Sequence, residues 1–133
     1  MKSIYMLLFV VFLFSCSKND ETTENLSESP EFLGKWKLKQ ILIDPGDGSG
    51  VYENVAYDAY LTMNSDGTVT LTNQTFCPGT QIVTANYYAD EDKIVPSCYG
   101  DGFSIVYSLQ EGNLILSYPC VEQCLNKYEK VIE

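Results

Sequence analysis

Residues 31–44 read Glu31-Phe-Leu-Gly-Lys-Trp-Lys-Leu-Lys-Gln-Ile-Leu-Ile-Asp44. One series of alternate positions holds Trp36, Leu38, Gln40 and Leu42, and the other holds Lys35, Lys37 and Lys39. A repeat of two residues is typical of a β-strand with one buried face. Trp36 is the only tryptophan in the chain, and Gly34 allows a tight turn just before it. We therefore expect a strand over about residues 33–43, with the rest of the fold built against it.

The chain after this strand alternates between short apolar runs and turn-forming residues. Further strands are predicted at about 55–64, 68–76, 81–89, 93–97, 103–109, 113–118 and 124–132. Clusters of Gly, Asp and Asn separate them, for example in the loop 44–50 and in the hairpin turn 64–67. Short strands with tight connections predict an all-β domain over residues 31–133, a small eight-stranded antiparallel up-and-down barrel.

The first fifteen residues have the composition of an export signal, with Lys2 followed by an apolar run that is too short to span a bilayer. The sequence Leu13-Phe-Ser-Cys16 resembles the lipobox of bacterial lipoproteins. The resemblance implies that the signal peptide is cleaved before Cys16 and that Cys16 is lipidated. The alternative is a secreted protein with an ordinary cleavage site.

Residues 16–30 are polar, with Leu26 as the single large apolar side chain, so they predict a flexible linker. Ser17-Lys-Asn-Asp-Glu21 resembles the short charged signal that sends some Bacteroidetes lipoproteins to the outer face of the outer membrane. The alternative is that these residues only solvate the linker. We expect a monomeric outer membrane lipoprotein on the periplasmic or cell-surface face, attached to the membrane by its lipid anchor.

Charge and residue usage argue against several classes of function. The chain has 8 basic and 18 acidic residues, for a formal net charge of −10, and no basic patch, so a nucleic-acid partner is not expected. It has no histidine, no Gly-x-Ser-x-Gly motif and no phosphate-binding loop. We therefore predict that the protein is not an enzyme and needs no cofactor.

Four of the five cysteines fall in the barrel region, and in an up-and-down order all of them flank loops at one end. Three pairings are possible, and we favour Cys77 with Cys98 and Cys120 with Cys124. The alternative, a four-cysteine zinc site, is disfavoured in an oxidising compartment. Oxygen ligands for calcium in the loop after Asp44 are also disfavoured, since turn chemistry explains that loop, so no metal is expected.

Gly34-Lys-Trp36 matches the Gly-x-Trp motif near the start of lipocalins, and the eight-strand meander fits the same family. The chain more closely resembles small lipocalin-like lipoproteins of Bacteroidetes, with a calycin-like barrel. That resemblance also rests on 44–50, on Asp66-Gly67, and on Pro119-Cys-Val-Glu-Gln-Cys124 with Lys127-Tyr128. It implies a closed end at which a basic side chain, here Lys130, packs across Trp36 beside Gly34.

A barrel of eight strands either fills with side chains or holds one small ligand. The residues predicted to line a pocket open toward the cysteine end are Leu38, Tyr57, Leu61, Tyr87, Phe103, Tyr107, Tyr118 and Tyr128. Leu42 and Val83 are predicted to face inward as well. The expected function is binding of a small apolar or amphipathic ligand at the outer membrane. The alternative is a disulfide-stapled surface module that binds protein or glycan through its rim loops, with no internal ligand.

Overall fold

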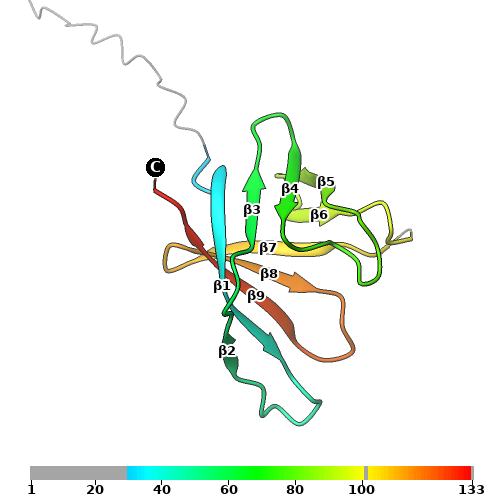
Figure 1. The fold of residues 1–133 in the computed structure, drawn as a ribbon. Coiled ribbons are helices and arrows are strands. Elements are labelled where there is room, and N and C mark those ends of the chain that lie inside the picture. Colours follow the sequence, from blue (N-terminus) through cyan, green and yellow to red (C-terminus); the bar gives the residue numbers. More distant parts are fainter. Residues whose placement is uncertain (1–29, 101, 133) are drawn as a thin grey trace, which may run out of the picture.

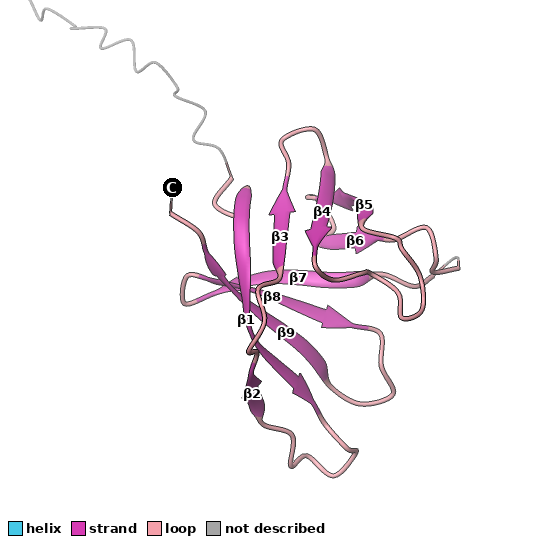
Figure 2. Cartoon of the chain, viewed as in Figure 1, coloured by secondary structure: helices cyan, strands magenta, loops and turns pink. Residues whose placement is uncertain are grey.

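The computed structural model describes residues 30–100 and 102–132. The predicted signal peptide, the linker up to residue 29 and Cys16 lie outside the described residues. The strands are β1 (Gly34–Ile43), β2 (Tyr52–Asn54), β3 (Tyr60–Met63), β4 (Thr68–Thr72), β5 (Thr84–Tyr88), β6 (Lys93–Val95), β7 (Ile105–Gln110), β8 (Asn113–Tyr118) and β9 (Cys124–Lys130) (Figures 1 and 2). Within the described ranges, no helix has the length and apolar character needed to cross a membrane.

The strands pair antiparallel in chain order from β3 to β9, and β9 then pairs with β1 from Trp36 opposite Lys130 to Ile43 opposite Cys124. Since β9 occupies one edge of β1, β2 and β3 share the other edge. β2 pairs with residues 40–42 and β3 with residues 34–37. The two segments therefore fill one strand position, and the predicted closed barrel of eight antiparallel strands is confirmed.

The strand predicted over residues 55–64 is interrupted. Five residues, 55–59, separate the paired parts of β2 and β3, whereas only Leu38 and Lys39 separate the corresponding parts of β1. Hydrogen bonds from the Val55 N–H to the Lys39 carbonyl and from the Leu38 N–H to the Ala59 carbonyl, both 2.9 Å long, close the ladder on each side. The extra residues loop out of the sheet and carry the exposed Tyr57 with them.

A β-bulge at Lys39 changes which side chains of β1 face inward. The register with β9 shifts between Leu38 and Gln40, so one residue of β1 has no partner there. Beyond the bulge Ile41 packs against the main core. Leu42, predicted to face inward, is buried, but it lies outside that core and has Tyr52 and Leu125 as its cross-strand neighbours.

Large apolar side chains fill the barrel around the start of β1. The fully buried ones include Trp36, Leu61, Met63, Ile94, Leu114, Leu116 and Tyr128. Figure 1 shows that the start of β1 and the end of β9 lie at this same end of the molecule. Packing here therefore closes one half of the barrel.

Residues 31–33 form a strap across this closed end. The Trp36 indole N–H donates to the Phe32 carbonyl at 2.8 Å. Lys130 Nζ donates to the carbonyls of Glu31 at 2.5 Å and Leu33 at 2.7 Å, and it lies 4.8 Å from the centre of the Trp36 ring. Gly34 adopts φ +109°, a left-handed conformation that favours glycine, with Lys130 beside it. The structure thus brings together the three residues that the sequence assigned to this end.

Candidate functional site

The opposite end of the barrel carries both disulfides. Cys77, in the β4–β5 loop, bonds to Cys98, in the β6–β7 loop, with 6.5 Å between their Cα atoms. Cys120 bonds to Cys124 across the β8–β9 connection, with a Cα separation of 5.9 Å. The favoured pairing is confirmed, and thiols joined in this way are not zinc ligands. Among the described residues, no cluster of three or more potential metal ligands occurs.

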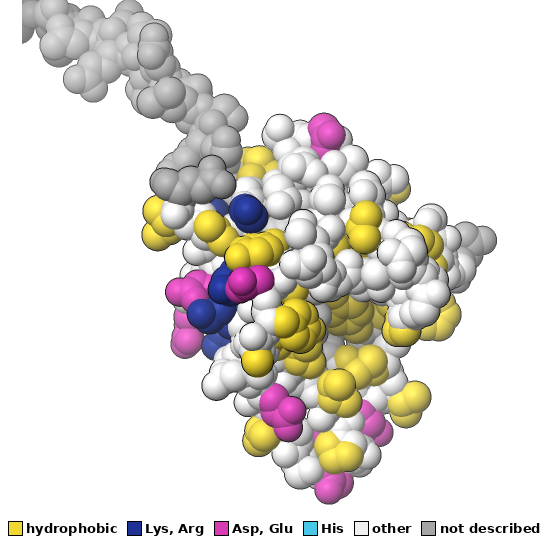
Figure 3. Space-filling model, in the orientation of Figure 1, with side chains coloured by type: hydrophobic (Ala, Val, Ile, Leu, Met, Phe, Trp, Pro, Cys, Tyr) yellow, Lys and Arg dark blue, Asp and Glu magenta, His cyan; other side chains and the backbone are white. Residues whose placement is uncertain are grey.

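An open cleft of about 490 Å³ lies at this disulfide end. Strand β1 and the β4–β5 loop contribute Leu38, Ile41, Leu42, Ile43, Gln74, Thr75, Phe76 and Pro78. The rest of the lining consists of Tyr57, Tyr99, Tyr118, Pro119, Cys120, Cys124 and Asn126. Figure 3 shows hydrophobic side chains gathered around a hollow in this part of the surface. Four loops that are distant in sequence therefore meet around one apolar space.

Hydrogen bonds fix the few polar groups of the cleft. Gln74 donates through Nε2 to the Tyr60 carbonyl at 3.0 Å and accepts from the Tyr128 hydroxyl through Oε1 at 3.1 Å. Asn126 Nδ2 donates to the Tyr118 hydroxyl oxygen at 3.3 Å. The Tyr99 hydroxyl donates to the Phe76 carbonyl at 3.3 Å. These bonds hold the amides and the phenols of the cleft in defined positions.

Burial affects the protonation of three phenols in and beside the cleft, those of Tyr99, Tyr118 and Tyr128. Burial raises the pKa of Tyr118 well above its usual value, and the neighbouring Tyr128 raises it further. Burial also raises the pKa of Tyr128 and that of Tyr99. Because the neutral form of each phenol is favoured, these tyrosines supply hydrogen-bonding groups without a negative charge.

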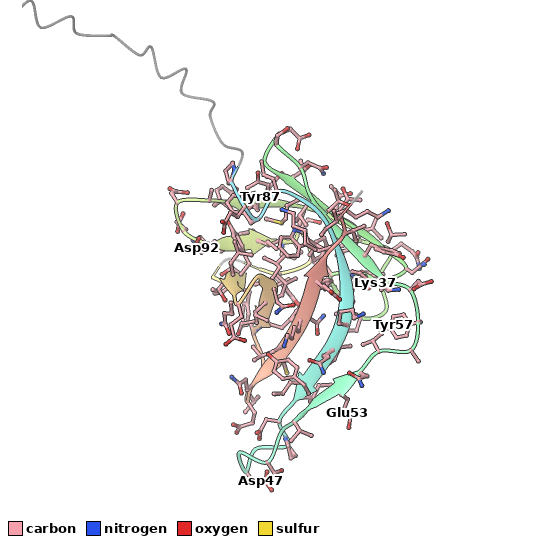
Figure 4. The ribbon with its side chains drawn as sticks, turned by 90° about the vertical axis from the view of Figure 1, so that its left-hand side faces the viewer. Lys37, Asp47, Glu53, Tyr57, Tyr87 and Asp92 are labelled. Atoms are coloured by element: carbon pink, nitrogen blue, oxygen red, sulfur yellow. A yellow bond between two sulfur atoms is a disulfide. The ribbon has the colours of Figure 1, made fainter. Side chains whose placement is uncertain are left out.

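The structure brings together only part of the predicted pocket. Leu38, Tyr57 and Tyr118 line the cleft, although the Tyr57 side chain is 53% exposed. Leu61 and Tyr128 are buried in the core, and neither lines the cleft, although the Tyr128 hydroxyl donates to the lining residue Gln74. In Figure 4, Tyr57 lies between β2 and β3, whereas Tyr87 lies near the start of β1, at the closed end of the barrel.

Tyr87 and Tyr107 belong to the closed end, where each packs against Phe32 with ring centroids 5.6 and 5.4 Å apart. The Tyr87 hydroxyl donates to the Asn64 carbonyl at 2.7 Å. The Tyr107 hydroxyl is buried and has no hydrogen-bond partner among the described residues. Burial, with a smaller effect from Asp92, raises its pKa to about 12. Neither tyrosine lines the cleft, so their placement in the pocket was wrong.

Phe103 and Val83 were also placed wrongly from the sequence. Phe103 is 55% exposed and lies 6.3 Å from Tyr99, because β7 begins only at Ile105 and the preceding chain has left the sheet. Val83 precedes the start of β5 and is exposed as well. The alternation of apolar residues continues past the ends of these strands, so it overestimates their length.

Several lining residues were missed. Ile41 enters the cleft because of the bulge, which the alternation of β1 does not reveal. The Cys77–Cys98 disulfide joins the two loops that contribute Gln74, Phe76 and Tyr99. Asn126 is the one that the sequence could have indicated, since it lies two residues before Tyr128 and shares its face of the last strand.

The loop between β1 and β2 is organised by Asp44. Its carboxylate accepts hydrogen bonds from the N–H groups of Gly46 at 2.7 Å, Gly48 at 3.1 Å and Gly50 at 2.9 Å. These bonds lower the pKa of Asp44, the bond from Gly50 most strongly. A Cβ at Gly50 would lie 2.8 Å from Asp44, so the loop closes tightly on this side chain. The carboxylates of Asp44 and Asp47 therefore accept hydrogen bonds from backbone N–H groups of their own loop and stabilise its turn.

Comparisons with protein-family models, with curated proteins and with solved structures found no match.

Proposed function

We propose that the protein binds one small, largely apolar molecule in the cleft at the disulfide end. The observation that carries this proposal is the cleft itself, about 490 Å³ of space in a barrel whose other half is packed. Ligand sites in proteins are typically apolar spaces of roughly 300–1,000 Å³ with a few fixed polar groups. Here the apolar walls carry Gln74, Thr75 and Asn126 as the neutral polar positions, besides the tyrosine hydroxyls.

The construction of the rim supports a binding role. Two disulfides and the Asp44 turn restrain the loops that surround the cleft. A restrained rim reduces the ordering that binding would otherwise require, so more of the contact free energy remains as affinity.

The cellular setting that we propose follows from the sequence before the barrel. A lipobox-like segment ending at Cys16, followed by a polar linker, supports a lipocalin-like lipoprotein held at the outer membrane, on its periplasmic or cell-surface side. In this setting the barrel is a non-catalytic carrier or sensor of its ligand.

A second candidate function has one observation in its favour. Apolar side chains stand exposed near the mouth of the cleft, with Ile43 and Val51 each 68% exposed and Val121 fully exposed. Such residues suit contact with another macromolecule. In that case the rim, and not the cleft, would carry the function.

Native mass spectrometry of the protein purified from its own membrane separates the two. We expect a reproducible small-molecule adduct on the unaltered protein. Ile41→Trp, which fills the cleft with a larger side chain, should abolish the adduct. The control Val106→Trp places the same side chain at an exposed outer position and should retain it. An unaltered protein that is repeatedly free of adduct, or an adduct that survives in Ile41→Trp, would contradict ligand binding in the cleft.

A further inference from the structure

The lining of the cleft contains no charged side chain, although the chain has a net charge of −10. All fifteen lining residues are apolar, aromatic or neutral polar. Their polar groups are amides and hydroxyls, such as those of Gln74, Thr75 and Asn126. A ligand that fits this lining needs an apolar body and a neutral hydrogen-bonding group.

No lysine among the described residues lines the cleft. Lys37 pairs with Asp58 at 2.6 Å and Lys39 with Glu129 at 3.3 Å, both on the outer face of the sheet. Lys127 lies 5.6 Å from the ring of Tyr52, also on the outside. Lys130 is held at the closed end. A carboxylate in the cleft would therefore lie without a cation beside it.

Two loops that adjoin lining residues of the cleft carry negative charge. The β1–β2 loop carries Asp44 and Asp47, and the β8–β9 loop carries Glu122. The two loops lie close together: a Cβ added at Gly46 would lie 3.4 Å from the Glu122 carboxylate. Carboxylates around an opening with apolar walls repel anions that approach it.

We propose that the cleft selects uncharged amphipathic ligands, of the type of a medium-chain alcohol, and excludes the corresponding carboxylates. This inference rests on the proposed function and names the ligand class for the same site. Transfer of an unpaired carboxylate into an apolar environment is far more costly than transfer of a hydroxyl. The head group of a fatty acid can avoid that cost only by staying at the mouth, where the acidic loops disfavour it.

The test uses 1-decanol and decanoate as probes, in isothermal titration calorimetry at pH 7 and about 0.15 M salt. The two have the same chain length and differ in the charge of the head group. We expect 1-decanol to bind at least about tenfold more tightly than decanoate.

A charge introduced at the mouth should change this preference. Ile43 lines the cleft and is 68% exposed, so Ile43→Lys adds a cation where decanoate would place its head group. Affinity for decanoate should rise by about tenfold. The matched control Val106→Lys adds the same charge at an exposed position outside the cleft and should leave the preference unchanged.

The outcomes distinguish the two proposals. Binding of decanoate as tight as that of 1-decanol would overturn the selection while leaving the cleft as a ligand site. Equal responses of Ile43→Lys and Val106→Lys would also overturn it, because the discrimination would not arise at the mouth. Binding of neither probe would overturn the selection together with the proposed function.

Discussion

At the scale of single residues, Lys130 links the last strand to the start of the first strand at the closed end of the barrel. Its ammonium group donates to two carbonyl oxygens of the strap and lies over Trp36. A hydrogen bond from a charged group contributes more than one between neutral groups, and an exposed cation–π contact adds roughly 0.5–1 kcal/mol. One side chain on the last strand therefore holds the segment that precedes the first.

Replacing Lys130 by Met should destabilise the fold by about 1–2 kcal/mol, because the apolar stem remains while the charged bonds are lost. For a domain of this size the melting temperature, followed by circular dichroism, should fall by roughly 4–12 °C. The control Lys127→Met removes a cation that lies over the ring of Tyr52 and leaves the strap intact, so a smaller decrease is expected. Equal decreases in the two variants would contradict the role of the strap.

At the scale of elements, the sequence predicts which strands pair better than it predicts which side chains face the inside of the barrel. Alternation and tight turns predict the order of strands and their closure, and the location of four cysteines at one end follows from that order. The Lys39 bulge was not predictable, because apolar residues occupy both Ile41 and Leu42 and the pattern fits either register. The break over residues 55–59 was hidden in the same way, since Tyr57 and Ala59 continue an apolar alternation through a segment that leaves the sheet.

The β1–β2 loop gives a pH-dependent prediction. Backbone hydrogen bonds lower the pKa of Asp44 in the folded protein, so its carboxylate stabilises the fold at neutral pH. That contribution is complete above the unfolded pKa of about 4 and disappears as the pH falls through the folded pKa. Asp44→Asn should therefore melt below the unaltered protein at pH 7, and the difference should shrink as the pH is lowered below about 4.

The control for this loop is Glu53→Gln, which makes the same change of charge in β2 and breaks none of the Asp44 bonds. Thermal melts of both variants across the pH range provide the comparison. A difference between Asp44→Asn and the unaltered protein that is independent of pH would show that the carboxylate charge is not what orders the loop.

At the scale of the whole molecule, the barrel divides into a packed half and an open half. Trp36, Tyr128 and their neighbours fill the closed half, whereas the cleft and both disulfides occupy the other. Covalent links therefore restrain the half of the barrel that contains the cleft. The positions of the cysteines follow from the up-and-down order, which places alternate connections at the same end.

The two disulfides should differ in how much they stabilise this open half. Cys77–Cys98 closes a segment with a sequence separation of 21, whereas Cys120–Cys124 closes one of 4. In the chain-entropy model the longer loop is worth roughly 3 kcal/mol and the shorter roughly 2 kcal/mol. Cys77 is also buried in the core, so its replacement removes packing, whereas Cys120 is exposed. The double variant Cys77→Ala/Cys98→Ala should therefore lose more unfolding free energy in urea than Cys120→Ala/Cys124→Ala. The reverse order would mean that the β8–β9 connection, and not the link between the β4–β5 and β6–β7 loops, carries the stability of the open end.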